Sequence, residues 1–205
     1  MHVRRLREGE DKQTKPIYAV WEITLRCDHA CSHCGSRAAK PRDTELDRKG
    51  LFEVADALVR LGTREVTLIG GEAYLHPDCE ALVEHLTGMG IWVSMQTGGR
   101  ALTRARVDSL AKAGIKAIGV SIDGPEEVHD VLRGVRGSYA TAVAGLQHTI
   151  DAGLMASTNM QVNRLTYHTL EQHYEMLDAM RVRSWRCQLT VPMGRAADNP
   201  QWLLE

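Results

Sequence analysis

The sequence predicts an α/β fold with six parallel strands, built either as an open doubly wound sheet or as a (β/α) barrel. The first observation is that β-rich segments alternate with helical segments along the whole chain. The second is that several predicted strands are apolar on both faces, as buried parallel strands are. The third is that short polar motifs follow the strands, where both folds place their functional groups.

Size and composition agree with one globular domain. The chain has 205 residues, of which 43% are hydrophobic and 25% charged, and this length can bury a sizeable core. The formal net charge is −1, so the charge balance gives no reason to expect a nucleic acid or a membrane as partner. No apolar stretch approaches the roughly 20 residues that span a bilayer. We expect a cytoplasmic protein, in which cysteines stay reduced.

The first half of the chain contains three predicted strands, over residues 17–25, 66–69 and 91–96. A capping-box pattern from Thr44 to Asp47 predicts the start of the helix between the first two strands. The apolar stripe of this helix is Leu51, Val54, Ala55 and Leu58. Pro77 suits the first turn of the next helix, whose buried face would carry Cys79, Leu82, Val83 and Leu86.

The second half repeats the pattern, with strands predicted over residues 116–122, 155–162 and 184–191. Thr103 is predicted to cap a helix that ends before Gly114. Cys187 falls within the last strand, where we expect a small buried side chain. Two further helices are predicted from the apolar stripes Val143, Leu146, Ile150 and Leu170, Tyr174, Leu177.

Three cysteines and two histidines occupy the eight residues that follow the first strand, in the order Cys-Asp-His-Ala-Cys-Ser-His-Cys. Such density indicates a metal site. Zinc needs four ligands, and Cys27, Cys31 and Cys34 with either His29 or His33 could supply them. Structural zinc sites, however, usually draw their ligands from two separated segments. Three thiolates without a fourth protein ligand instead suit an iron–sulfur cluster with one open iron.

The spacing Cys-x3-Cys-x2-Cys resembles the signature of the radical SAM superfamily. This resemblance implies a partial (β/α)6 barrel of the TIM type. It also implies that Cys27, Cys31 and Cys34 hold a catalytic 4Fe–4S cluster whose open iron binds S-adenosylmethionine (SAM). The residue before the last cysteine, His33, would then lie near the adenine.

A second motif strengthens the resemblance. Gly70-Gly71-Glu72 follows the second strand and is similar to the family's GGE motif, which receives the methionyl amino group of SAM. Glycines allow a close approach of the backbone, and a carboxylate suits an ammonium group. Thr97, after the third strand, could contact SAM or substrate, or could form only a tight turn.

Further matches lie at the ends of later strands. Ser121 and Arg133 resemble the serine and arginine that contact the methionyl carboxylate in peptide-modifying members. The alternatives are a strand-end cap for Ser121 and a solvated loop cation for Arg133. Asp123 could bind a ribose hydroxyl or stabilise the Asp-Gly turn. Asn159 and Gln161 alternate along their strand, so both face one side of it, toward SAM or substrate in a barrel.

The resemblance also implies the chemistry. An external one-electron donor of the flavodoxin or ferredoxin type reduces the cluster, and SAM is cleaved to methionine and a 5′-deoxyadenosyl radical. This radical abstracts a hydrogen atom from the substrate. The cofactors carry the difficult chemistry, so the sequence need not show a catalytic triad.

The substrate is suggested by Ser-Ile-Asp-Gly at 121–124, Gly-Ser-Tyr at 137–139 and Val-Pro-Met-Gly-Arg-Ala at 191–196. Together these resemble radical SAM/SPASM enzymes, most of which mature ribosomally made peptides (RiPPs) or modify protein side chains. Those enzymes carry a C-terminal extension with additional cysteines. We expect 16–205 to be the radical SAM core of a longer protein, preceded by a flexible segment over 1–15. The alternatives are a small-molecule substrate, such as a nucleoside or cofactor precursor, and a non-catalytic zinc or iron–sulfur module.

Overall fold

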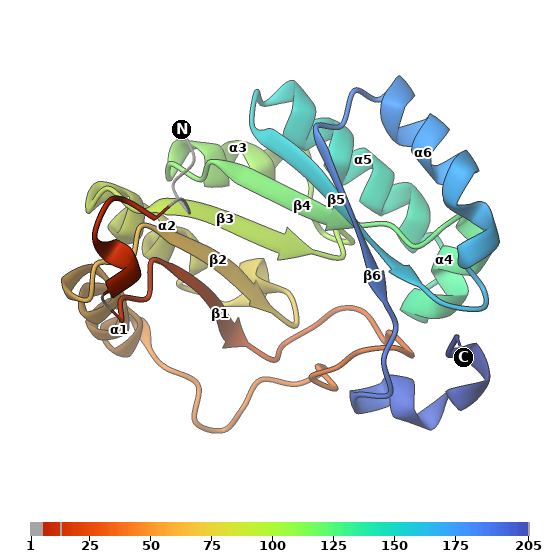
Figure 1. Cartoon of the computed structure of the whole chain (residues 1–205), viewed down its shortest axis with the longest axis horizontal. Helices are drawn as coiled ribbons and strands as arrows, with labels where there is room; N and C mark the ends of the chain where they lie inside the picture. Colours follow the sequence, from red (N-terminus) through yellow and green to blue (C-terminus); the bar gives the residue numbers. More distant parts are fainter. Residues whose placement is uncertain (1–5, 13, 205) are drawn as a thin grey trace.

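One sheet of six parallel strands, in the order β1-β2-β3-β4-β5-β6, organises the chain (Figure 1). The structure is a computed structural model that describes residues 6–12 and 14–204. The order in space equals the order in sequence, whereas a doubly wound sheet reverses direction partway. The arrangement is therefore the predicted partial barrel. The strands are β1 (Tyr18–Thr24), β2 (Glu65–Gly70), β3 (Trp92–Thr97), β4 (Ala117–Ser121), β5 (Met155–Val162) and β6 (Ser184–Leu189).

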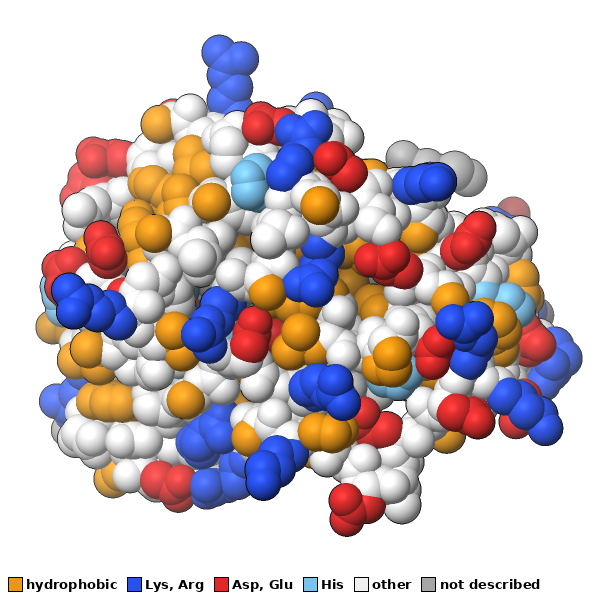
Figure 2. Space-filling model, turned by 180° about the vertical axis from the view of Figure 1, so that it is seen from behind, with side chains coloured by type: hydrophobic (Ala, Val, Ile, Leu, Met, Phe, Trp, Pro, Cys, Tyr) orange, Lys and Arg blue, Asp and Glu red, His pale blue; other side chains and the backbone are white. Residues whose placement is uncertain are grey.

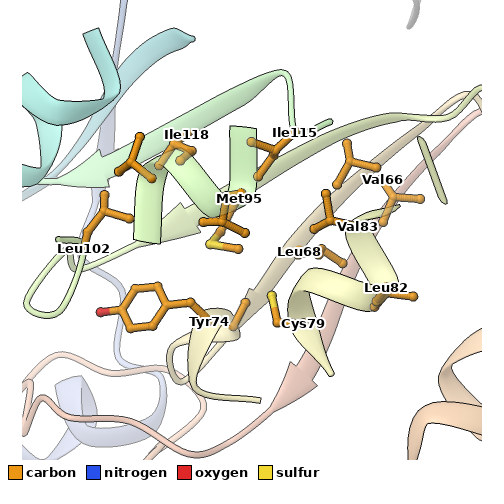
Figure 3. Close-up of a cluster of buried hydrophobic side chains, with 14 of the residues drawn as sticks. Val66, Leu68, Tyr74, Cys79, Leu82, Val83, Met95, Leu102, Ile115 and Ile118 are labelled. Carbon is orange, nitrogen blue, oxygen red and sulfur yellow. The ribbon is translucent and has the colours of Figure 1, made fainter. Parts of the chain in front are cut away.

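The α-helices connect these strands and lie along one face of the sheet, as Figure 1 shows. Leu68, Met95 and Ile118 from three neighbouring strands point toward this side and are fully buried, and helix side chains such as Leu82 pack onto them (Figure 3). The other face is called the inner face below. The helices are α1 (Arg48–Arg60), α2 (Cys79–Gly88), α3 (Arg104–Lys112), α4 (Glu126–Arg133), α5 (Ser138–Asp151) and α6 (Leu170–Ala179).

Two helix starts differ from the sequence-based expectation. Asp47 itself caps α1 by accepting a hydrogen bond from the Gly50 N–H, so the predicted capping box does not form. Helix α2 begins at Cys79, two residues after Pro77, and the ring nitrogen of His76 accepts a hydrogen bond from the Asp78 N–H just before it. Thr103 caps α3 as predicted, by accepting from the Arg106 N–H.

Three expectations about later segments were wrong. Helix α4 was not predicted, because it is only eight residues long and its N-cap, Pro125, offers no side-chain hydrogen bond. Tyr174 is 58% exposed rather than part of the buried stripe of α6. Cys187 is exposed, because β6 lies at the edge of the sheet.

The described surface carries charges of both signs. On the face in Figure 2, acidic and basic side chains are interspersed among apolar ones. Among the described residues, no helix combines the length and apolarity that a membrane crossing requires. Residues 1–5 and 13 of the predicted N-terminal segment lie outside the described residues. Within its described part, Glu10 forms an ion pair with Arg64 at 3.1 Å.

Candidate active site

The three cysteines lie on a loop that begins at the carboxyl end of β1 and is pinned at both ends by backbone hydrogen bonds. The Cys27 N–H donates to the Ala39 carbonyl at 3.0 Å. The N–H groups of Ala30 and Ser32 donate to the carbonyls of Arg133 and Leu132 at 3.1 and 2.9 Å. The last turn of α4, missed in the sequence, therefore supports the middle of the loop.

The loop borders a hollow of about 190 Å³ on the inner face, at the carboxyl ends of the strands. All of the predicted site residues line this hollow except Asp123, Asn159 and Gln161. The residues that line it are Cys27, Cys31, His33, Cys34, Ala38, Ile69, Gly70, Gly71, Glu72, Gln96, Thr97, Gly98, Ser121 and Arg133. The structure thus brings together motifs that follow four different strands.

The arrangement of sulfur atoms tests which metal group fits. A tetrahedral zinc ion with Zn–S bonds of about 2.3 Å holds its ligand atoms about 4 Å apart. The three cysteine sulfurs do not gather within 4.8 Å of one another; the group that does is Cys27, Asp28, His29 and Glu72. A Cys3His zinc set is therefore not assembled, whereas wider spacing suits a multi-iron cluster.

Unpartnered polar atoms support the same interpretation. Buried polar atoms normally have hydrogen-bond partners. Two atoms that have none among the described residues belong to side chains that line the hollow, namely Nδ1 of His33 and Nε of Arg133. A bound polar group in the hollow would supply such partners. The residues present therefore fit a cluster with SAM beside it.

Burial favours the protonated form of two of the thiols, those of Cys27 and Cys31, in the protein without its cluster. Burial raises the pKa of Cys27 to about 12. Burial also raises the pKa of Cys31, an effect that the neighbouring Arg133 guanidinium opposes. Because metal ligation requires thiolates, loading the cluster releases protons from this loop.

Hydrogen bonds from the carboxyl end of β3 hold the side chain of Glu72 in place. It is 3% exposed, and its Oε1 accepts a hydrogen bond from the Gly98 N–H at 2.7 Å. Its Oε2 accepts from the Thr97 hydroxyl, and Nδ1 of His29 lies 3.6 Å from Oε1. Burial raises the pKa of Glu72, while Thr97 and the His29 side chain oppose this. Thr97 thus positions the carboxylate that was predicted to receive the SAM ammonium group.

The two glycines before Glu72 allow the close backbone approach that was predicted from the sequence, and the structure shows which carbonyl groups they meet. A Cβ on Gly71 would collide with the carbonyl oxygen of Arg26, and one on Gly70 would lie 2.7 Å from the carbonyl oxygen of Thr24. Any side chain here would push β2 away from the start of the cysteine loop. The glycines therefore set the distance between the cysteine motif and the Gly-Gly-Glu motif.

Asp123 does not line the hollow, and its side chain does more than stabilise the Asp-Gly turn. It is fully buried, and its Oδ2 lies 2.7 Å from Nη2 of Arg133 and 3.6 Å from Nε2 of His33. Its Oδ1 accepts from the Gln161 N–H at 2.7 Å. Burial raises the pKa of Asp123, but Arg133 and the nearby histidines lower it more, so the net pKa lies below its usual value.

Arg133 is likewise not a solvated loop cation. It is the last residue of α4 and is 8% exposed. Besides its pair with Asp123, its Nη1 lies 3.9 Å from the Cys31 sulfur. Burial lowers the pKa of His33 to about 4, so this ring is neutral at pH 7. Arg133 therefore brings one positive charge to the cluster loop, and Asp123 balances it.

Two residues near the other end of the chain, which were not predicted as site residues, form a clasp on the cysteine loop by hydrogen bonds to its carbonyl groups. The residues are Arg195 and Asn199, in the segment after β6. Figure 1 shows this terminal segment beside the loop that follows β1. Nε of Arg195 donates to the Cys31 carbonyl at 2.6 Å, and Nη2 donates to the Ala38 carbonyl at 3.1 Å. Nδ2 of Asn199 donates to the Ser32 carbonyl at 3.1 Å.

We expect Arg195→Ala to lower cluster retention. The variant loses two charge-assisted hydrogen bonds to the loop, each worth about 1.5–3 kcal/mol. Iron and sulfide per chain, measured after identical anaerobic reconstitution, should fall well below the wild-type content. Arg136→Ala removes an exposed arginine elsewhere and should load normally. Equal loading of both variants would show that the clasp is dispensable.

Comparisons with known proteins agree with this geometry. Residues 21–177 match the radical SAM superfamily. The chain is 33% identical over 197 residues to the mycofactocin maturase MftC of Mycobacterium tuberculosis, covering 95% of this chain and 50% of that protein. It is 28% identical over 180 residues to an AdoMet-dependent heme synthase of Oleidesulfovibrio alaskensis, covering 87% of this chain and 46% of that protein. The chain thus spans about half the length of these relatives.

Solved structures share the fold at low sequence identity. Streptococcus suis SuiB bound to S-adenosylmethionine superposes with a TM-score of 0.78 at 16% identity, covering 89% of this chain and 43% of that one. The anSMEcpe protein with bound AdoMet and a peptide gives 0.72 at 16% identity, covering 85% and 50%. Radical SAM enzymes use a 4Fe–4S cluster and SAM, the groups that the cysteine loop and the hollow fit. The chain belongs to the radical SAM superfamily.

Proposed function

We propose that this chain is the catalytic core of a radical SAM enzyme that modifies a ribosomally made peptide or a protein side chain. The observation that carries the proposal is the free edge of β6. Within residues 6–12 and 14–204 this strand pairs with β5 alone, so in this part of the chain its other edge presents unpaired backbone N–H and C=O groups. An extended peptide could add to this edge by main-chain hydrogen bonds.

The path of β6 supports a peptide at this edge. The strand leads directly into the segment that carries Arg195, which contacts the cysteine loop. A peptide lying along β6 would therefore run toward the hollow at the strand ends. The mycofactocin maturase relatives, and the SuiB structure bound to its precursor peptide SuiA, give the same class of substrate.

The proposed roles follow from the geometry of the hollow. Cys27, Cys31 and Cys34 would hold the cluster, and Glu72, kept in place by Thr97 and Gly98, would bind the methionyl ammonium group. When bound, the cluster and SAM supply the 5′-deoxyadenosyl radical that abstracts hydrogen. The sheet and the cysteine loop enclose the reacting groups and limit access of water.

Ser121, Arg133 and His33 complete the proposed SAM contacts. Ser121 and Arg133 line the hollow and would face the methionyl carboxylate, and neutral His33 would lie by the adenine. Asp123 would act on SAM only through Arg133. We place Asn159 and Gln161 on the substrate side of the inner face rather than against SAM.

A second candidate is a radical SAM enzyme that acts on a tetrapyrrole. The heme synthase relative matches over 87% of this chain, and a small, flat molecule would use the inner face without needing the β6 edge. In either case we propose a cytoplasmic enzyme, because a reducing compartment keeps its thiols available for iron. We also propose a flavodoxin- or ferredoxin-type protein as the one-electron donor.

Deuterium transfer distinguishes the two candidates. Short peptides encoded by genes that adjoin its own are made in perdeuterated form and incubated anaerobically with the reconstituted protein, reductant and SAM. We expect deuterium to appear in 5′-deoxyadenosine, with a matching mass change in the peptide. Deuterium transfer from an iron porphyrin, with none from any peptide, would contradict the peptide proposal. A Cys31→Ala sample serves as the blank.

A further inference from the structure

The inner face of the sheet is lined by neutral hydrogen-bonding side chains that contact one another across strands. The Tyr18 hydroxyl donates to the Thr67 hydroxyl at 3.1 Å, and Thr67 shares a hydrogen bond of 2.8 Å with Ser94. Farther along, Nδ2 of Asn159 donates to Oε1 of Gln96 at 2.9 Å. This last pair bridges β3 and β5 over Gly119, where any Cβ would collide with the Gln96 amide.

Charged side chains are rare on this face. Among its strand positions, all of which are described, the charged residues are Glu22, Glu65 and Arg186. Glu22 is ion-paired with Arg42, and Glu65 is buried near the start of β2. Arg186 is exposed on β6, and across residues 6–12 and 14–204 it has no hydrogen-bond or ion-pair partner. The face therefore carries one cation, Arg186, that no described residue neutralises.

The strand register places this cation beside the hollow. Ser121 pairs with Asn159, and Asn159 pairs with Arg186. Directly paired residues of neighbouring parallel strands point to the same side of the sheet. Met160, next to Asn159, is in the core on the helix side, so this row lies on the inner face. With strands about 4.8 Å apart, the Arg186 backbone is about 10 Å from that of Ser121, which lines the hollow.

The geometry points to Arg186 as the residue that binds an anionic group of the substrate, which we propose to be a carboxylate. A guanidinium group presents a planar fork that matches a carboxylate with two parallel hydrogen bonds. The hydrogen-bonded side chains of Gln96 and Asn159 form a neutral polar surface, called the floor below, between this guanidinium group and the hollow. A substrate held at its carboxylate would thus extend across the floor toward Ser121. This assignment rests on the proposed function, since it names the chemistry of the substrate that the same site would accept.

Binding of a matched pair of probes tests the assignment. The probes are N-acetyl-trialanine, which has a free carboxylate, and its C-terminal amide, which has none. Arginine Nε–H signals of the reconstituted, SAM-bound protein are followed by NMR during titration with each probe. We expect the acid to shift the Arg186 signal in a saturable manner and the amide to leave it unchanged. Equal shifts with both probes, or none with either, would overturn the assignment.

Variants at Arg186 distinguish the contribution of its positive charge to binding from that of its planar guanidinium group. Arg186→Gln should weaken binding of the acid about tenfold or more, and Arg186→Lys should restore only part of it because the fork is lost. Arg183→Gln removes an exposed arginine just before the same strand and should bind the acid as the wild type does. An Arg186→Gln protein that binds the acid normally would refute the proposal.

Cleavage of SAM is measured in a separate assay, apart from the binding of the probes. Without substrate, the control Arg183→Gln should form 5′-deoxyadenosine at the wild-type rate, because Arg183 is exposed and does not line the hollow. Failure of the wild type to cleave SAM would refute the proposed function while the probe titration still decides the role of Arg186.

Discussion

Replacing Cys31 with alanine will abolish formation of 5′-deoxyadenosine. The three cysteines are the only thiols that line the hollow in the described part of the chain, so the loss of one leaves too few ligands for the cluster. Wild-type and variant proteins are reconstituted anaerobically with iron and sulfide, reduced, mixed with SAM, and assayed for 5′-deoxyadenosine. The wild type should form it, and the variant should remain at background.

Cys187→Ala is the matched control, because Cys187 is a free cysteine that is exposed on β6. This variant should keep full iron content and full SAM cleavage. Cleavage that survives in Cys31→Ala would contradict the cluster assignment. Stoichiometric zinc in the isolated wild type, with no 5′-deoxyadenosine after reconstitution, would point instead to the group of Cys27, Asp28, His29 and Glu72.

Replacing Asp123 with alanine will strongly destabilise the fold. Its carboxylate is fully buried and lies 2.7 Å from the Arg133 guanidinium, so the variant leaves a buried positive charge without its partner. Breaking a buried pair in this way costs about 3–5 kcal/mol in the free energy of unfolding. Urea unfolding of the cluster-free protein under anaerobic, reducing conditions measures this loss.

A second substitution tests whether the unpaired charge of Arg133 causes the loss of stability. Arg133→Met in the Asp123→Ala background removes the stranded charge and should recover much of the lost stability. Asp108→Ala breaks an exposed pair with Arg104, in which both side chains are 53% exposed, and should cost no more than about 1 kcal/mol. An Asp123→Ala loss as small as that of Asp108→Ala would show that the pair does not hold the loop.

The sheet could be predicted from the sequence because each strand is indicated by residues that are close together in the chain. Each strand is a short β-rich run followed by a polar motif, and parallel connection places all strand ends at one edge. The Cys-x3-Cys-x2-Cys and Gly-Gly-Glu motifs are therefore adjacent once the strands are assigned. Their spacing along the chain already contained the information needed to place them at one site.

The contacts that the sequence did not reveal are those between distant segments. Nothing in the run from Glu126 to Arg133 indicates that its last residue turns inward to meet Asp123. The same holds for Arg195, which reads as a charged residue in a loop until its guanidinium is seen on the Cys31 carbonyl. Cys187 was assigned to the core from its residue type, whereas exposure depends on which strand forms the edge.

The clasp on the cysteine loop also constrains when the loop can mature. The hydrogen bond from Asn199 to Ser32 joins residues that are 167 positions apart in sequence, and that from Arg195 to Cys31 spans 164. During synthesis, the loop leaves the ribosome long before its clasp does, and contacts of such high sequence separation form late in folding. Until then the loop has its backbone hydrogen bonds to neighbouring segments but lacks the side-chain contacts of Arg195 and Asn199. The chain therefore acquires its finished cluster-binding loop after translation of the sixth strand, which makes iron loading a late step in the life of the protein.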